Sequence, residues 1–489
     1  MERSVGQTET RIIEFAGPLL LESGAVLRPV RVAYETYGRL NEERSNAILI
    51  CHALSGDAHA AGYHANANKS GWWESAIGPG KGFDTDRHFV ICSNVLGGCQ
   101  GSTGPSSIDP KTGKPFGIGF PVITIKDMVQ VQKLLVEHLG IKQLAAVAGG
   151  SMGGMQALQW AVTYPEMLRK LVVIASTASS TPQQIAFNTV GRKAITSDPD
   201  WNDGDYYGGE RPALGLSIAR MVGHITYLSD DSMRQKFGRN LQDKKKVGFD
   251  FSTDFQVESY LQHQGDTFVN RFDPNSYLYI TKAIDYFDLS KRGSLIAGLS
   301  AVKAKVLVVG ISSDWLYPVY QSQEIVSALN AHQAEASYAE IRSNYGHDAF
   351  LLEEGQLNYI LKNFFGEVLV ADVMLRDICT ITEDTTIVKA AELMLRGETN
   401  HLPVVDAEGR LMGIVTSWDI AKAVARGLDD LHQIVSAPVL TARGEDRIGS
   451  AIRSMEKNHI SALPVVDDEE KVQGLVTTEC LGPLLGRCR

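Results

Sequence analysis

Cysteine is scarce in this sequence. Six cysteines occur in 489 residues, and no CxxC pair is present. This usage excludes a small disulfide-stabilised scaffold and a cysteine-based zinc site, and no metal site is predicted. It is typical of a protein that works in a reducing compartment.

Long apolar runs and a strong excess of one charge are also missing. No uncharged run of about 18 apolar residues occurs, and the N-terminal MERSVGQTETRIIEF has no apolar signal core. The 47 basic and 57 acidic residues are scattered along the chain. We therefore expect a cytoplasmic protein that binds neither membranes nor nucleic acid.

Short apolar runs alternate with helix-like stretches through the first part of the chain. NAILICHA, HFVICSNV, QLAAVAGG and KLVVIAST are followed, after a long gap, by KVLVVGIS and ASYAEIRS. This alternation predicts an α/β fold with a mostly parallel sheet formed by residues 1–178 and 300–366. The gap, residues 179–299, is predicted to be an inserted helical cap.

The C-terminal part contains an internal repeat. HLPVVDAEGRLMGIVTSWDI aligns with ALPVVDDEEKVQGLVTTECL at a constant offset of 61 residues, the separation of Pro403 and Pro464. Each copy follows a helix-like segment, so the repeating unit is predicted to be α+β. We expect two units, at 370–428 and 429–489, that bury each other's apolar faces.

The segment AVAGGSMGGMQALQW has the G-x-S-x-G pattern of a nucleophile elbow. Ser151 lies between a strand-like run and a helix-like run, which is the context that this motif requires. The following helix would direct its positive end towards the serine. The alternative is a glycine-rich turn with no catalytic role.

A nucleophilic serine needs a base and an orienting acid, which follow it in this fold in the order acid, base. Asp314 follows the run KVLVVGIS, and His347 follows the last strand-like run. Asp348 is the main rival for the acid, and a surface position is the alternative for His347. We expect Met152, the residue after the nucleophile, and Leu54 in CHALSGD to supply the oxyanion-hole amides.

Four other histidines are poorer candidates for the base. His138 and His332 lie in helix-like segments, whereas His52 and His59 precede the serine.

Several motifs together resemble the homoserine O-acetyltransferase family of the α/β-hydrolase fold. They are CHALSGDAHAAG, NVLGGCQGSTGPSS, AGGSMGGMQALQWA, ARMVGHITYLS, SSDWLYP and YGHDAFL. The resemblance implies that acetyl-CoA, as a co-substrate and with no tightly bound cofactor, acylates Ser151. L-Homoserine would then accept the acetyl group for methionine synthesis. A succinyl donor and a serine esterase that uses the same triad remain the alternatives.

The resemblance implies two more binding residues. Arg220 matches the family's arginine that holds the amino-acid substrate, because a guanidinium can bind both carboxylate oxygens. Asp348 matches the aspartate that pairs with the substrate ammonium.

The C-terminal repeats resemble a pair of CBS domains. In that family a Thr and an Asp three residues later, here Thr416 and Asp419, contact an adenosine ligand such as S-adenosylmethionine, AMP or ATP. The second copy has Cys480 where Asp is expected, so one nucleotide site is predicted. Both modules resemble families that form dimers, which implies a homodimer; the alternative for the pair is a dimerisation block without a ligand.

A third interpretation is an adenosine-ligand sensor whose N-terminal domain has lost its activity. It is disfavoured because Ser151, Asp314 and His347 are all present.

Overall fold

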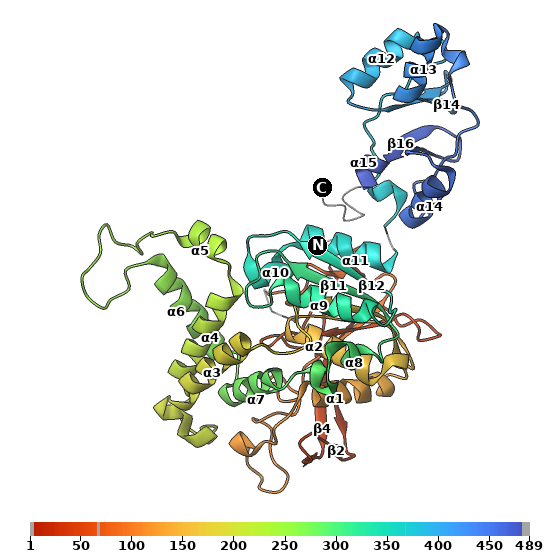
Figure 1. Ribbon diagram of the computed structural model, residues 1–489. Helices are drawn as coiled ribbons and strands as arrows, with labels where there is room; N and C mark the ends of the chain where they lie inside the picture. The colour runs from red at the N-terminus through yellow and green to blue at the C-terminus, as the bar shows by residue number, and fades with distance from the viewer. Residues whose placement is uncertain (1–3, 66–68, 367, 482–489) are drawn as a thin grey trace. The chain divides into compact units, whose positions relative to one another are not determined.

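The chain folds into two units, residues 1–360 and 361–489, in a computed structural model that describes residues 4–65, 69–366 and 368–481. An eight-stranded sheet forms the centre of the first unit (Figure 1). The strand order is β1-β4-β8-β5-β9-β10-β11-β12. Five neighbouring pairs, from β8–β5 to β11–β12, are parallel, and the pairs β1–β4 and β4–β8 are antiparallel. The predicted α/β class and the mostly parallel sheet are confirmed. The strands are β1 Arg11–Phe15, β4 Val30–Tyr37, β5 Ala47–Cys51, β8 Phe89–Ser93, β9 Leu144–Gly150, β10 Leu168–Ile174, β11 Lys305–Ile311 and β12 Ala336–Ile341.

The central strands are buried because crossover helices pack on the sheet. All five residues of β5 are buried, and so are six of the seven residues of β9. Strands buried on both faces read as continuous apolar runs, which is why these runs could be identified in the sequence. The helices of this core are α1 Ile125–His138, α2 Met152–Thr163, α9 Val319–Asn330, α10 Ala349–Leu352 and α11 Glu354–Phe365; the short strands are β2 Leu19–Leu20, β3 Val26–Leu27, β6 Ile77–Gly78 and β7 Phe83–Asp84.

The turn between β9 and α2 is strained at Ser151. This residue is the N-cap of α2 with φ 57° and ψ −126°, a conformation that non-glycine residues rarely adopt. A Cβ atom on Gly153 would lie 2.0 Å from the Cys51 carbonyl oxygen, and one on Gly149 would lie 2.8 Å from it. Glycine is therefore required where β5 and the turn pack together.

A helical insertion separates β10 from β11 (Figure 1). Helix α3 begins with a capping box, in which the Thr181 amide donates to Gln184 Oε1 at 2.9 Å and Pro182 occupies the first turn. The segment ALGLSIARMVGHITYL forms α4, which packs against α3 and α6. The helices are α3 Pro182–Thr196, α4 Ala213–Tyr227, α5 Asp230–Phe237, α6 Gln256–Val269, α7 Pro274–Asp285 and α8 Leu295–Leu299.

The second unit contains two copies of one α+β motif. The hairpins β13–β14 and β15–β16 are antiparallel, and each has an irregularity at the same place, Val404/Val405 and Val465/Val466. Each hairpin packs with its own helices in a separate apolar cluster. The elements are α12 Ile387–Arg396, β13 His401–Val405, β14 Leu411–Thr416, α13 Ser417–Arg426, α14 Ile448–Asn458, β15 Ala462–Val466, β16 Val472–Thr477 and α15 Thr478–Leu481. The last part of the second predicted repeat, residues 482–489, lies outside the described residues.

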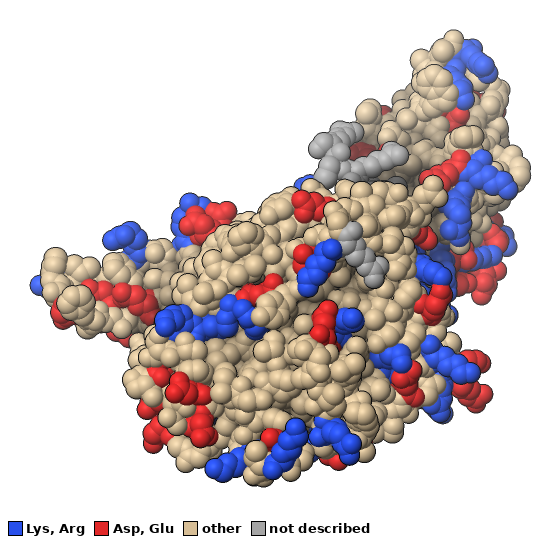
Figure 2. All heavy atoms as spheres, turned by 60° about the horizontal axis from the view of Figure 1, so that its bottom comes forward, with Lys and Arg blue, Asp and Glu red and all other residues tan. Residues whose placement is uncertain are grey.

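Short 3₁₀ segments complete the secondary structure. They are Gly117–Gly119, Pro165–Met167, Pro199–Gly204, Leu289–Arg292, Gly346–Asp348, Val370–Asp372 and Leu431–Gln433. Within the described ranges, no helix is both long and apolar enough to cross a bilayer. Acidic and basic side chains alternate over the face drawn in Figure 2, with no extended field of one sign.

Candidate active site

Asp314 and His347 form a buried hydrogen-bonded pair. Asp314 follows β11, and its Oδ1 atom accepts the amides of Leu316 and Tyr317, each at 2.9 Å. Its Oδ2 atom accepts a hydrogen bond from His347 Nδ1 at 2.6 Å. The acid is thus held by two backbone donors, and it fixes the imidazole tautomer in which Nε2 is free to accept a proton.

The serine and the histidine meet at one cavity of about 440 Å³. Ser151 and His347 both contribute to its wall, and so do Leu54, Arg220 and Asp348. Ser151 is only 9% exposed, and it lines this cavity. The five residues come from four segments far apart in the chain, because His347 and Asp348 are neighbours, and the fold brings them to one space.

Opposing effects set the pKa of His347. Burial lowers the pKa, whereas the negative charge of Asp314, its hydrogen bond and the charge of Asp348 raise it, and the net result is a pKa above the ordinary value of histidine. The imidazolium form that a general base acquires is therefore stabilised in place. Burial is also the main reason why the pKa of Asp348 is raised.

His52 organises the loop that carries Leu54. His52 Nδ1 lies 2.8 Å from the Ala53 carbonyl oxygen, and Nε2 accepts the Val95 amide at 3.1 Å. Burial lowers the pKa of this histidine, which keeps it in the neutral form that these two contacts require. His52 thus has a structural role and does not compete as a base. Met152 is the first residue of α2, so its amide has no acceptor within the helix.

Two arginines add positive charge to the cavity. Arg220 Nη1 donates to Ser55 Oγ at 3.3 Å, and Arg271 Nη1 donates to the Ser55 carbonyl at 2.9 Å. Arg220 also lies over the ring of Phe268, 4.6 Å from its centroid. Burial and the neighbouring Arg220 lower the pKa of Arg271. The half-buried pair lines the same cavity as Asp348, so the cavity suits a substrate that carries both an anionic and a cationic group.

Comparisons with known proteins identify the families of both parts of the chain. The α/β hydrolase fold family matches residues 46–354, and the CBS domain family matches residues 370–426 and 431–481. A homoserine O-acetyltransferase of Methanosphaerula palustris is 61% identical over 484 residues, which cover 99% of each chain. One of Methanosarcina acetivorans is 57% identical and covers 99% of this chain and 96% of its own.

The chain belongs to the homoserine O-acetyltransferase family.

Solved structures related to this acetyltransferase-family chain include both transferases and hydrolases. The homoserine O-acetyltransferase of Bacillus anthracis is 33% identical with a TM-score of 0.70, over 73% of this chain and 97% of its own. Esterase E22 is 34% identical with a TM-score of 0.69, over 73% of this chain and 100% of its own. The fold alone therefore does not distinguish transfer from hydrolysis.

Thr416 and Asp419, which are predicted to bind a nucleotide, form the N-terminal cap of helix α13. Thr416 is the N-cap of α13, and its hydroxyl donates to Asp419 Oδ2 at 2.6 Å, while the Asp419 amide donates to Thr416 Oγ1 at 3.2 Å. Lys422 Nζ lies 3.3 Å from Asp419 Oδ1. In the second repeat the Thr477 amide donates to Cys480 Sγ at 3.1 Å, so cysteine takes the place of the carboxylate in the same turn.

Sequence reasoning missed three residues that contribute to the site. Arg271 and Tyr227 line the cavity, and burial raises the pKa of the Tyr227 phenol. Tyr317 is buried, its ring centroid lies 5.1 Å from that of His347, and it interacts with the Ser151 hydroxyl. Tyr317 lies in the motif SSDWLYP, three residues after Asp314. This short spacing could have indicated that its side chain lies near the predicted acid. Arg271 stands in no recognisable pattern.

The geometry predicts that Asp348→Asn lowers the pKa of His347. Removing this negative charge removes one of the effects that favour the imidazolium. NMR titration of the labelled histidine ring is expected to show its midpoint at lower pH, with the His347–Asp314 pair still present. Glu354→Gln, at an exposed position on α11, is the control and should leave the midpoint unchanged. An unchanged midpoint in the Asp348 variant would show that its charge does not reach the imidazole.

Proposed function

We propose that this protein transfers the acetyl group of acetyl-CoA to the hydroxyl of L-homoserine through an acyl-Ser151 intermediate. The observation that carries the proposal is the buried Asp314–His347 pair at a cavity that also contains Ser151 and charged groups of both signs. The names of the relatives, at 54% to 61% identity across the whole chain, support the same reaction.

In the first half-reaction, His347 Nε2 takes the proton from Ser151 Oγ while this oxygen attacks the thioester carbonyl carbon. The carbonyl oxygen becomes an oxyanion, which the amides of Leu54 and Met152 stabilise together with the positive end of α2. The carbon–sulfur bond then breaks, and the CoA sulfur receives the proton from His347. The product is an ester of Ser151.

In the second half-reaction, His347 takes the proton of the homoserine hydroxyl as its oxygen attacks the acyl-serine. The bond from the acyl carbon to Ser151 Oγ breaks, and the serine regains its proton from His347. Arg220 binds the substrate carboxylate and Asp348 binds its ammonium, so the hydroxyl is held near the ester at high effective concentration. Such positioning favours the amino acid over water as the acceptor.

Free thiol release distinguishes transfer from hydrolysis. With acetyl-CoA alone we expect a burst of CoA that stops near one equivalent per site, and with L-homoserine added we expect continuous turnover. Equal steady release with and without homoserine would support an esterase-like hydrolase instead. Parallel reactions with succinyl-CoA test the donor, and faster turnover with succinyl-CoA would contradict the acetyl assignment.

Ser151→Ala is expected to remove both the burst and the acyl adduct in intact-protein mass spectrometry. Loss of a nucleophile in such a triad lowers kcat by roughly 10⁴-fold or more. Ser327→Ala, at an exposed position on α9, is the control and should retain the adduct. An acyl adduct of normal abundance in the Ser151 variant would show that another residue is acylated.

Arg220→Lys is expected to weaken homoserine use selectively. Lysine keeps the charge but cannot bind a carboxylate through two parallel hydrogen bonds, so kcat/KM for homoserine should fall by about 10- to 100-fold. The rate of acylation by acetyl-CoA should change much less. Arg239→Lys, an exposed position in the insertion, is the control. Homoserine kinetics equal to wild type would exclude this role.

We further propose that the CBS pair binds one adenosine ligand at Thr416 and Asp419. A carboxylate can accept hydrogen bonds from both ribose hydroxyls, and the second repeat has Cys480 at the corresponding position. Calorimetry on the full chain with S-adenosylmethionine, AMP and ATP should detect one site for one of them. Asp419→Asn should weaken that binding by at least about 10-fold, while Cys480→Ser should not. Equal binding to the Asp419 variant would contradict the assignment.

The domain division and assembly state complete the proposal. We propose a core of residues 1–178 and 300–366, a cap of residues 179–299 and two CBS repeats at 370–428 and 429–489. The resemblance of both modules to dimeric families supports a homodimer, and the cysteine usage supports a cytoplasmic enzyme.

A further inference from the structure

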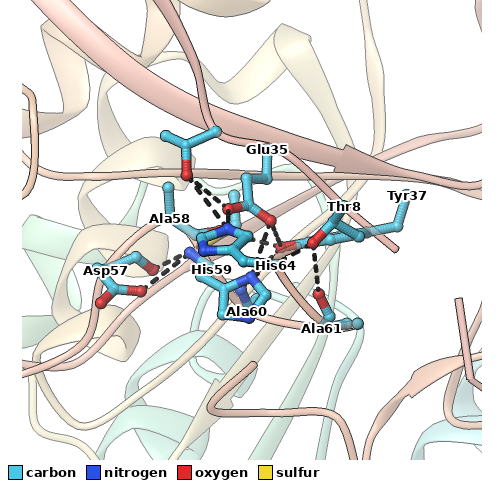
Figure 3. Close-up of polar contacts among 12 residues, drawn as sticks. Thr8, Glu35, Tyr37, Asp57, Ala58, His59, Ala60, Ala61 and His64 are labelled. Carbon is cyan, nitrogen blue, oxygen red and sulfur yellow. Dashed lines mark hydrogen bonds and ion pairs between the residues drawn. The ribbon is translucent and has the colours of Figure 1, made fainter. Parts of the chain in front are cut away.

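A second polar cluster lies beside the catalytic cavity and takes no part in the proposed transfer. Glu35 on β4, His59 and His64 each offer one ligand atom, and these atoms lie within 4.8 Å of one another (Figure 3). His59 Nδ1 is 3.1 Å from Glu35 Oε2, and His64 Nε2 is 2.7 Å from Glu35 Oε1. The two imidazole rings are tilted by 32° relative to each other, with centroids 3.8 Å apart.

Glu35 is a fully buried carboxylate that two hydroxyl groups orient. Thr10 Oγ1 donates to Glu35 Oε1 at 2.7 Å, and the Tyr37 hydroxyl lies 3.0 Å from Oε2. A buried carboxylate is costly unless it is paired or hydrogen-bonded, and four side chains, those of Thr10, Tyr37, His59 and His64, lie at hydrogen-bonding distance from Glu35.

The backbone around His59 is held in place beside Glu35. The His59 amide donates to Asp57 Oδ1 at 2.9 Å, which fixes the position of the histidine backbone.

We propose that Glu35, His59 and His64 form a binding site for one Zn²⁺ ion. Two imidazole nitrogens and one carboxylate oxygen are the donor set of many sites for zinc and related first-row metals. Metal–ligand bonds of about 2.0–2.1 Å with tetrahedral angles separate ligand atoms by about 3.3 Å. The His59 and His64 nitrogens lie 3.1 and 2.7 Å from different oxygens of Glu35, and one ligand atom from each of the three residues lies within 4.8 Å of the others. Side-chain shifts that bring these atoms to the tetrahedral separation would complete the site. Thr10 and Tyr37 supply the outer contacts that hold a ligating carboxylate in place.

The ion would connect β4 to the segment that leads from the oxyanion loop. His59 and His64 also line the cavity that contains Ser151. His59 Nε2 is buried and has no hydrogen-bond partner among the described residues, and it would carry the proton of the metal-bound neutral imidazole. The site is separate from the acyl-transfer groups, because none of its three ligands acts on the substrate.

Calorimetry with Zn²⁺ on the chelator-treated full chain tests the site. We expect one ion per chain with a dissociation constant in the micromolar range or below, and a Tm that rises with Zn²⁺ concentration. His64→Gln should weaken binding by at least about 100-fold, and because this side chain is 39% exposed, its loss should leave the core intact. Glu35→Gln should weaken Zn²⁺ binding by a similar factor in protein that circular dichroism shows to be folded.

Two controls separate this site from surface binding and from the acyl-transfer reaction. His263→Gln, at an exposed position on α6, should bind Zn²⁺ as the wild type does, and so should Ser151→Ala. Co²⁺ in place of Zn²⁺ should give visible absorption bands that His64→Gln abolishes. Absence of a stoichiometric ion in the wild type, or equal affinity in the His64 variant, would overturn the proposal and leave a metal-free His–Glu–His hydrogen-bonded cluster.

Discussion

The close packing of the Cys51 carbonyl against the turn at Ser151 is the constraint on which the rest of the site depends. Positions 149 and 153 must be glycine, because a Cβ atom at either position would lie too close to that oxygen. This contact joins β5, β9 and the start of α2, and it holds Ser151 at a positive φ that an unsupported turn would not adopt. One tight backbone contact therefore fixes the turn that carries Ser151 and begins α2 at Met152.

The charged groups of the cavity come from different layers of the molecule. Arg220 and Arg271 belong to the inserted helices and the turn after them, whereas Asp348 follows β12 in the core. Ser55, on the loop after β5, touches both arginines. The insertion is thus tied to the oxyanion loop by polar contacts, and a charged amino acid bound between Arg220 and Asp348 would bridge the insertion and the core. Such a bridge is a physical basis for favouring an amino-acid acceptor over water.

Much of this arrangement could be predicted from the sequence because its signals are local. The runs that form β5, β8, β9, β10 and β11 are mostly buried, and the elbow has a fixed motif between a strand and a helix. The edge strand β1 and its neighbour β4 were missed, because RIIEF and VRVAYETY mix apolar and polar residues and pair antiparallel. The roles assigned to Leu54, Arg220 and Asp348 remain predictions that the shared cavity supports.

Contacts that depend on tertiary packing had no such signal. Glu35, His59 and His64 lie at irregular spacings, and they come together only in the folded chain, where Glu35 on β4 contacts both histidines of the segment after β5. Arg271 reaches Ser55 across a separation of 216 residues. The Thr416–Asp419 cap has a spacing typical of a capping box, so a helix start could have been predicted there as readily as a ligand site.

The two histidines on either side of the nucleophile have pKa values that move in opposite directions. The pKa of His52 is lowered and that of His347 is raised. When a solution is acidified, the base therefore becomes protonated while the oxyanion loop keeps its neutral supporting imidazole and both backbone contacts. Protonation of His347 would therefore lower activity at a pH at which His52 still makes both of its backbone contacts.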